Sequence, residues 1–187
     1  MKNDKDKSGL PHDKFYRKVF SKKANLIDLL KNALPEEYIN KIDFDSIKLS
    51  KESFMSDKLR PFWSDMVISA KMRGKDIKIT ILIEHKANYD KFTLFQMLKY
   101  LVNIWDEEVK DDTSNLTPVI PVLVYHGKAE WDSNRDMNMC FNHSIDEVLK
   151  RFIPAFDYIL FDLNQVEDDK LIGNIEYMAA VKIMKYV

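Results

Sequence analysis

Hydrophobic and polar positions alternate with two periods along the chain, and changes of period divide it into predicted elements. Residues 11–34 carry apolar side chains at helical spacing, which predicts a helix that Pro35 ends. A break within the segment FSKKAN would leave Ser21 to cap a second helix. Strict alternation predicts a short strand over residues 42–50, and apolar positions three and four apart predict an amphipathic helix over residues 91–110.

Two apolar runs, residues 62–72 and 76–86, flank the segment RGKD. A glycine between two such runs is a hairpin signal, so the pair is predicted to form antiparallel strands. In the second strand four isoleucines share one face, whereas Leu82, Glu84 and Lys86 share the other. On this face the polar residues Glu84 and Lys86 follow the apolar Leu82. Exposure of the strand end to solvent therefore does not by itself explain the polar pair.

The second half of the chain predicts two further strands and a closing helix. The strands are expected over residues 117–127, where Gly127 ends the first, and over residues 156–166. We expect a flexible basic lead over residues 1–10 and one folded domain over residues 11–166. The helix over residues 167–187 keeps its apolar pattern to its last residue, which predicts the start of a truncated helical region.

Composition narrows the class to a soluble, intracellular protein. The chain has 187 residues, of which 45% are apolar, enough for one packed core. Cys140 is its single cysteine, so no intrachain disulfide forms, and the charged N-terminus lacks a secretory segment. The longest apolar run, residues 118–125, contains two prolines and is too short to span a bilayer. We therefore expect a cytoplasmic protein.

Charge and glycine content exclude several functions. The net charge is −1, which is not typical of a protein that coats DNA, although residues 1–25 carry eight Lys or Arg against three Asp. That arm fits phosphate contact as well as a solvated tail. Only four glycines occur, so a Gly-rich phosphate loop is excluded. The four His and one Cys form no recognisable four-ligand zinc set, so structural zinc is not expected.

The predicted hairpin carries the candidate chemistry. Asp65 on one strand and Glu84 on the next can share a hard divalent cation, and the backbone carbonyl of His85 can add a third oxygen. Lys86, two positions after Glu84, is placed to polarise an attacking water. Taken alone, Glu84 and Lys86 fit a surface ion pair at a strand end better than a catalytic site. Asp65 lies between apolar neighbours, where an unpartnered carboxylate is costly.

These residues resemble the D…(D/E)-X-K signature of the PD-(D/E)XK nuclease superfamily. Three segments are similar to the Rpn family of recombination-promoting nucleases, also labelled transposases: HDKFYRKVF at residues 12–20, IEHKA at 83–87, and VIPVLVYHGKAEW at 119–131. The resemblance covers residues 11–165 in the expected order. The superfamily's proline before the first aspartate is Ser64 here, while the lysine of the signature is retained.

The resemblance implies a restriction-endonuclease-like α/β core, with a mixed sheet of four or five strands flanked by helices. It also implies DNA cleavage that depends on Mg²⁺, with Mn²⁺ as an alternative cofactor. Asp65 and Glu84 would be metal ligands, and Lys86 the catalytic lysine. DNA is the expected partner, and no membrane association is expected. Members of the superfamily often dimerise, so the resemblance also allows a homodimer.

Five further residues are secondary candidates. Gln96 and Tyr100 match a Q-x-x-x-Y element of RecB-like nucleases, and their spacing places them on one helix face. They could contact DNA, brace the catalytic strand or form a polar helix edge. His12 and Asp13 open the first helix, where Asp13 suits the helix dipole better than a metal. His126 ends a strand and is interpreted as structural.

The sequence therefore favours a metal-dependent DNA endonuclease linked to recombination. The alternative is a catalytically silent nuclease-fold module that binds DNA or protein. Retention of Asp65, Glu84 and Lys86 argues against the silent module, and the near-neutral net charge argues for it. Strand transfer would rest on the family's label alone.

Overall fold

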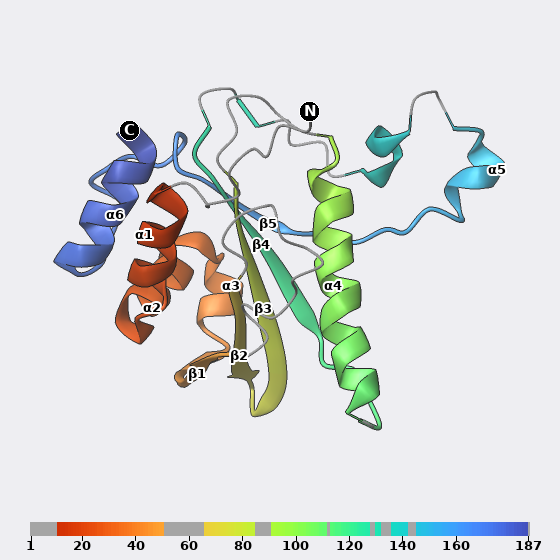
Figure 1. Ribbon diagram of the computed structural model, residues 1–187, viewed down its shortest axis with the longest axis horizontal. Helices are drawn as coiled ribbons and strands as arrows, with labels where there is room; N and C mark the ends of the chain where they lie inside the picture. The colour runs from red at the N-terminus through yellow and green to blue at the C-terminus, as the bar shows by residue number, and fades with distance from the viewer. Residues whose placement is uncertain are drawn as a thin grey trace, which may run out of the picture.

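The protein forms one five-stranded sheet with helices on both faces (Figure 1). The computed structural model describes residues 11–50, 66–84, 91–111, 113–127, 130–131, 136–141 and 145–186, with the backbone alone for residues 11–14, 17 and 81–84. The strands are β1 (Ile42–Leu49), β2 (Met66–Met72), β3 (Lys75–Glu84), β4 (Val119–Tyr125) and β5 (Ile159–Asp162). The helices are α1 (Pro11–Phe20), α2 (Lys23–Ala33), α3 (Glu36–Ile39), α4 (Thr93–Lys110), α5 (Glu147–Lys150) and α6 (Ile175–Tyr186), with a 3₁₀ turn, η2 (Met137–Cys140).

The sheet is mixed, in the order β1-β2-β3-β4-β5. Strands β1, β2 and β3 are antiparallel neighbours, whereas β3, β4 and β5 run parallel. The crossover from β3 to β4 contains α4, as a parallel connection requires. This arrangement confirms the predicted mixed sheet of four or five strands flanked by helices.

The β2–β3 hairpin forms as predicted, and local backbone chemistry explains why. Met72 pairs with Lys75 across a two-residue turn. Both turn residues have positive φ, 50° at Arg73 and 79° at Gly74. A turn with positive φ at both positions matches the right-handed twist of the strands it joins. The predicted strand ends over residues 62–65 and 85–86 lie outside the described residues.

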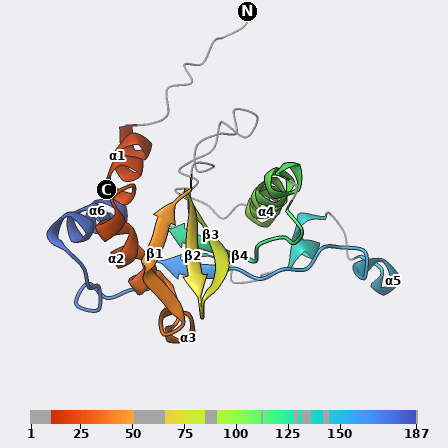
Figure 2. The same ribbon diagram turned by 90° about the horizontal axis from the view of Figure 1, so that it is seen from below.

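Two apolar layers hold the helices to the sheet. Ile79, Val122 and Val124 pack with α1, α2 and α6 on one face. Leu123 and Tyr125 pack beneath α4 on the other face. Neighbouring positions of β4 thus divide between the two layers, as expected for a strand buried on both sides. Figure 2 shows α1, α2 and α6 on one side of the strands and α4 on the other.

The predicted helix over residues 11–34 is divided within FSKKAN, the alternative that the sequence left open, but Ser21 does not cap the second helix. The N-cap of α2 is Lys22, which makes no side-chain capping bond. The Ser21 hydroxyl instead donates to the Lys18 carbonyl of α1 at 3.0 Å. Hydroxyls readily satisfy a carbonyl at the end of the preceding helix, and that competing bond made the capping prediction wrong. The short helix α3, which follows Pro35, was also not predicted.

The C-terminal elements are shorter than predicted. Strand β5 covers four residues of the expected 156–166. Helix α6 begins at Ile175, so the prediction of helix is wrong for residues 167–174. Asn174 decides this start, because its side-chain oxygen accepts the backbone N–H groups of Glu176 and Tyr177 at 3.0 and 3.1 Å. The short segments η2 and α5 were not predicted either. None of the described helices combines the length and apolarity needed to cross a bilayer.

Candidate functional site

The carboxyl ends of the three parallel strands meet at one edge of the sheet. Glu84, the last residue of β3, pairs in register with Tyr125 at the end of β4. Tyr125 in turn pairs with Asp162, the last residue of β5. In sheets with parallel strands, ligands bind at this edge, where loops leave the strand ends together. The row Glu84, Tyr125 and Asp162 therefore marks the candidate site.

The described backbone brings the two predicted catalytic strands together at this edge. Met66, which follows Asp65 in the sequence, pairs with Ile81, three positions before Glu84. Asp65, His85 and Lys86 themselves lie outside the described residues. Their roles as ligands and as the catalytic lysine stay predictions. Among the residues that the structure does describe, no group of three or more His, Cys, Asp or Glu side chains could hold a metal ion.

Gln96 and Tyr100 lie one turn apart on α4, over the candidate edge. The Gln96 amide approaches the Tyr100 hydroxyl at 3.5 Å, the long limit of a hydrogen bond. Tyr100 is buried with Leu123 and Tyr125 beneath the helix, whereas Gln96 is half-buried. Tyr100 thus braces the layer between α4 and the strand ends, and Gln96 keeps an open side.

His12, Asp13 and His126 lie in α1 or close to it, on the face of the sheet opposite α4. His12 and Asp13 lie in the first turn of α1, where only the backbone is described. His126 follows β4 and is buried, with its Nδ1 donating to the Met184 carbonyl of α6 at 2.9 Å. Its ring meets that of Tyr16 edge-on at 6.0 Å. His126 therefore joins the end of β4 to two helices, in agreement with its structural interpretation.

Asp162 is a residue at this edge that the sequence reasoning missed. Its carboxylate accepts the backbone N–H and the side-chain amide of Asn164 at 2.9 and 3.0 Å. The same amide also donates to the Gly127 carbonyl at 2.8 Å. Asp162 thus reverses the chain after β5 and ties that turn to the loop after β4. The D-x-N spacing at the end of an apolar run is the sequence signal from which this turn could have been predicted.

Tyr125 and Trp131, which belong to the Rpn-like segment at residues 119–131, form part of a buried aromatic group. The Tyr125 and Trp131 rings lie 4.9 Å apart, and the Trp131 indole N–H donates to the Tyr158 hydroxyl at 2.9 Å. All three rings are buried against α4. These rings therefore pack between the sheet and α4, beneath the candidate site.

A buried ion pair fixes α4 to β3 at the opposite end. The Lys78 ammonium lies 2.9 Å from the Glu108 carboxylate, and both side chains are nearly buried. The second carboxylate oxygen accepts the Thr117 backbone N–H at 2.8 Å. Burial alone would raise the pKa of Glu108, but the bonds from Thr117 and Lys78 outweigh it and lower the pKa. The pair sets how α4 lies across the sheet.

A mixed five-stranded sheet with helices on both faces and a carboxylate at the end of its central strand is consistent with a restriction-endonuclease-like core. The chain belongs to the family described as "Putative transposase, YhgA-like", whose model matches residues 10–187. The family assignment agrees with the resemblance in the motifs.

The relatives carry nuclease names. The chain is 27% identical over 179 residues to "Recombination-promoting nuclease RpnD" of Escherichia coli O157:H7, covering 95% of this chain and 68% of that protein. It is 27% identical over 184 residues to "Recombination-promoting nuclease RpnA" of Escherichia coli strain K12, covering 98% and 62%. It is also 23% identical over 178 residues to "Inactive recombination-promoting nuclease-like protein RpnE" of strain K12, covering 95% and 58%.

At the level of the family, these matches support a nuclease linked to recombination. The relatives include proteins named as nucleases and one named as inactive. The chain spans about three fifths to two thirds of the length of these relatives. No solved structure matches the chain.

Proposed function

We propose that this chain is a Mg²⁺-dependent DNA endonuclease domain that hydrolyses phosphodiester bonds. The observation that carries the proposal is the register of the hairpin: β3 ends at Glu84, and β2 begins at Met66, opposite Ile81. Asp65 precedes Met66 in the sequence, so this register supports the proposal that Asp65 and Glu84 act together. The nuclease names of the relatives support the same activity.

The donor set fits a hard cation. Asp65 and Glu84 supply carboxylate oxygens and His85 a backbone carbonyl, which are the ligands that Mg²⁺ prefers, with Mn²⁺ as a substitute. When bound, the ion lowers the pKa of a coordinated water and offsets charge that develops on the phosphate. Lys86 would hold the attacking water by its ammonium group, and the DNA phosphate would lie at the carboxyl edge of the parallel strands. A cut in both strands would take two copies of the domain, so a homodimer belongs to the proposal.

A second candidate function is a silent module that binds DNA or protein with this fold. The inactive name of RpnE, together with this chain's net charge of −1, favours it. Retention of Asp65, Glu84 and Lys86 favours the enzyme, because binding alone needs no such set.

Nicking of supercoiled plasmid in Mg²⁺ separates the two candidates. The parent is compared with Asp65→Ala, Glu84→Gln and Lys86→Ala, each confirmed as folded by circular dichroism. Asp76→Asn is the matched control, because Asp76 is an exposed carboxylate at the opposite end of the same strand. We expect the parent and the control to nick, the three variants to lose at least a hundredfold in rate, and EDTA to stop the reaction.

Two results would contradict the proposal of a nuclease that uses Asp65 and Glu84. Nicking that survives in Asp65→Ala and Glu84→Gln would move the chemistry elsewhere. A folded parent that neither nicks DNA nor binds Mn²⁺ in calorimetry would favour the silent module. Mn²⁺ binding that needs Asp65, without nicking, would indicate a metal site that lacks a further part of the enzyme.

A further inference from the structure

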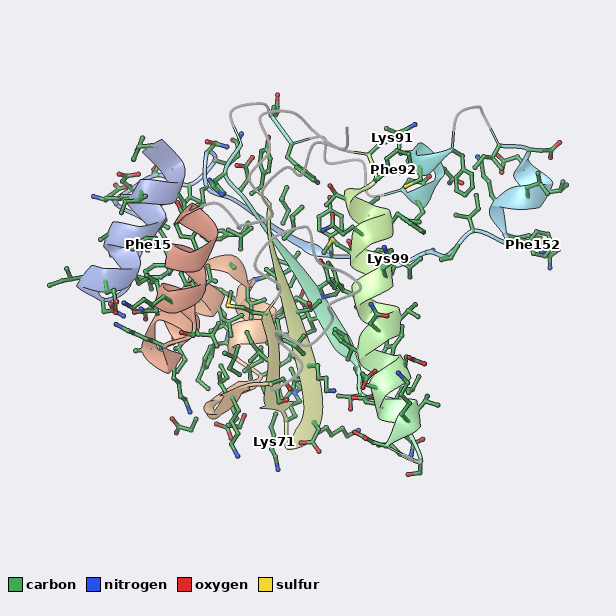
Figure 3. The ribbon with its side chains drawn as sticks, viewed as in Figure 1. Phe15, Lys71, Lys91, Phe92, Lys99 and Phe152 are labelled. Atoms are coloured by element: carbon green, nitrogen blue, oxygen red, sulfur yellow. The ribbon has the colours of Figure 1, made fainter. Side chains whose placement is uncertain are left out.

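Helix α4 exposes two phenylalanines on the side turned away from the sheet. Phe92 and Phe95 are each 50% exposed, although the helix buries Leu94 and Met97 between and beside them. Together with Lys99, they form a stripe on one face of the helix at positions three and four apart. We call Lys91, Phe92, Phe95 and Lys99 the α4 stripe. Figure 3 shows Lys91, Phe92 and Lys99 along this helix.

The charge of the stripe is one-sided. Residues 91–105 contain two lysines and no acidic residue, whereas Asp106, Glu107 and Glu108 follow directly. The first turn of the helix holds no acidic side chain, and its N-cap, Phe92, makes no capping bond. Acidic side chains in a first turn stabilise a helix through its dipole, and α4 has none there, although its last turn carries the favourable base Lys110. The helix dipole therefore does not account for the phenylalanines and lysines at the start of the helix.

The stripe lies at the end of the molecule where the candidate site lies. The N-terminal end of α4 and the carboxyl ends of β3 and β4 point the same way (Figure 1). The Cys140 thiol donates to the Lys91 carbonyl at 3.2 Å, which holds η2 against this end of the helix. The next residue, Phe141, is a third ring about half exposed.

We propose that the α4 stripe binds unpaired nucleotides of the DNA, with the phenylalanine rings stacking on bases and the lysines meeting phosphates. Aromatic rings interleaved with basic groups are the surface that holds single strands without reading their sequence. The rise along the helix axis from the N-cap Phe92 to Lys99 is about 10 Å, which is long enough for the stripe to contact more than one nucleotide. The proposal rests on the proposed function and adds a substrate class: DNA with a single-stranded or frayed segment beside the cut.

The chain offers a matched control on another element. Phe152, which follows α5, is 75% exposed, and the Arg151 guanidinium lies 5.6 Å from its ring centre. The Lys91 ammonium lies 5.1 Å from the Phe92 ring in the same way. Phe152 thus repeats the chemistry of the stripe far from α4, as Figure 3 shows.

The test is binding of a fluorescein-labelled 15-nucleotide oligo-dT and of a duplex of equal length, followed by anisotropy in EDTA to prevent cleavage. We expect the parent to prefer the single strand, and Phe95→Ala to weaken that binding on the order of tenfold. Phe95→Tyr should bind like the parent, whereas Phe95→Leu should bind like Phe95→Ala because leucine keeps apolarity without a ring. Lys99→Gln should lower the slope of log K against log salt by about 0.7. Phe152→Ala should bind like the parent.

The outcomes separate this inference from the proposed function. Equal single-strand binding by the parent, Phe95→Ala and Phe95→Leu would overturn the stripe, even if the plasmid is nicked. Absence of binding to oligo-dT by the folded parent would overturn it as well. Single-strand binding that needs Phe95, in a protein that never nicks, would leave the stripe standing and refute the enzyme. Loss of self-association in Phe95→Ala, measured by sedimentation with DNA binding intact, would assign the stripe to a protein interface and refute base stacking.

Discussion

Replacement of Glu108 by glutamine is the sharpest test of how α4 is held. The change keeps the shape of the side chain but removes the carboxylate that faces Lys78 at 2.9 Å. Both residues are nearly buried, with 9% of Lys78 and 7% of Glu108 exposed. Removal of one partner leaves the other charge in a poorly solvated position, a change that costs about 3–5 kcal/mol in buried pairs.

We expect Glu108→Gln to lower the free energy of unfolding by about 3 kcal/mol at neutral pH. For a chain of this size that loss corresponds to a fall in Tm of roughly 6–12 °C. Urea denaturation followed by circular dichroism measures the first quantity, and scanning calorimetry the second. Glu107→Gln is the matched control, because the neighbouring Glu107 makes only an exposed pair with Lys110, and its loss should cost under about 0.5 kcal/mol.

The pH dependence gives the same pair a second test. The pKa of Glu108 is lower in the folded protein than its ordinary value of 4.5. The unfolded chain therefore binds the proton first as pH falls, and this contribution to stability is present above pH 4.5 and is lost as pH falls through the folded pKa. The difference between the parent and Glu108→Gln should shrink at acidic pH. A variant within 0.5 kcal/mol of the parent at pH 7, or a difference that grows on acidification, would refute the reasoning.

Two further substitutions test the packing of α6 and of the aromatic group beneath α4. Gly173→Ala would place a Cβ 2.4 Å from the Cδ1 of buried Tyr177, so α6 must shift at a cost of about 1–3 kcal/mol; unchanged stability in urea denaturation would show that the ring gives way freely. Trp131→Phe removes the indole donor that bonds Tyr158 at 2.9 Å, and we expect a loss of about 1–3 kcal/mol by thermal denaturation. An equal loss in Tyr158→Phe, without a further loss in the double variant, would assign it to that bond.

Elements with a strong local signal were predictable from the sequence. The β2–β3 hairpin was predictable because Gly74 supplies the positive φ that its turn requires. Helix α4 was predictable because its apolar positions recur along one face for 18 residues. The bond that Ser21 makes to α1 and the extent of α6 were not predictable, because each depends on which of several competing local hydrogen bonds forms.

The candidate site divides in the same way. The carboxylates and the lysine were predicted from residue types and spacing, and of these the described backbone includes Glu84, at the end of β3. Its neighbours in space, Tyr125 and Asp162, come from 41 and 78 positions further along the chain. No short-range pattern links them, so their alignment was not predicted.

The sequence by itself determined helix α4, the β2–β3 hairpin and the chemical groups of the candidate site, because period, turn residues and side-chain type act over a few positions. Tertiary structure alone decided the order of the sheet, the row of residues at its carboxyl edge and the partner of Lys78. It also decided that the apolar side chains of Phe92 and Phe95 are each about half exposed. Those outcomes depend on which faces of distant elements meet when the apolar area is buried, and that choice is made by the whole chain at once.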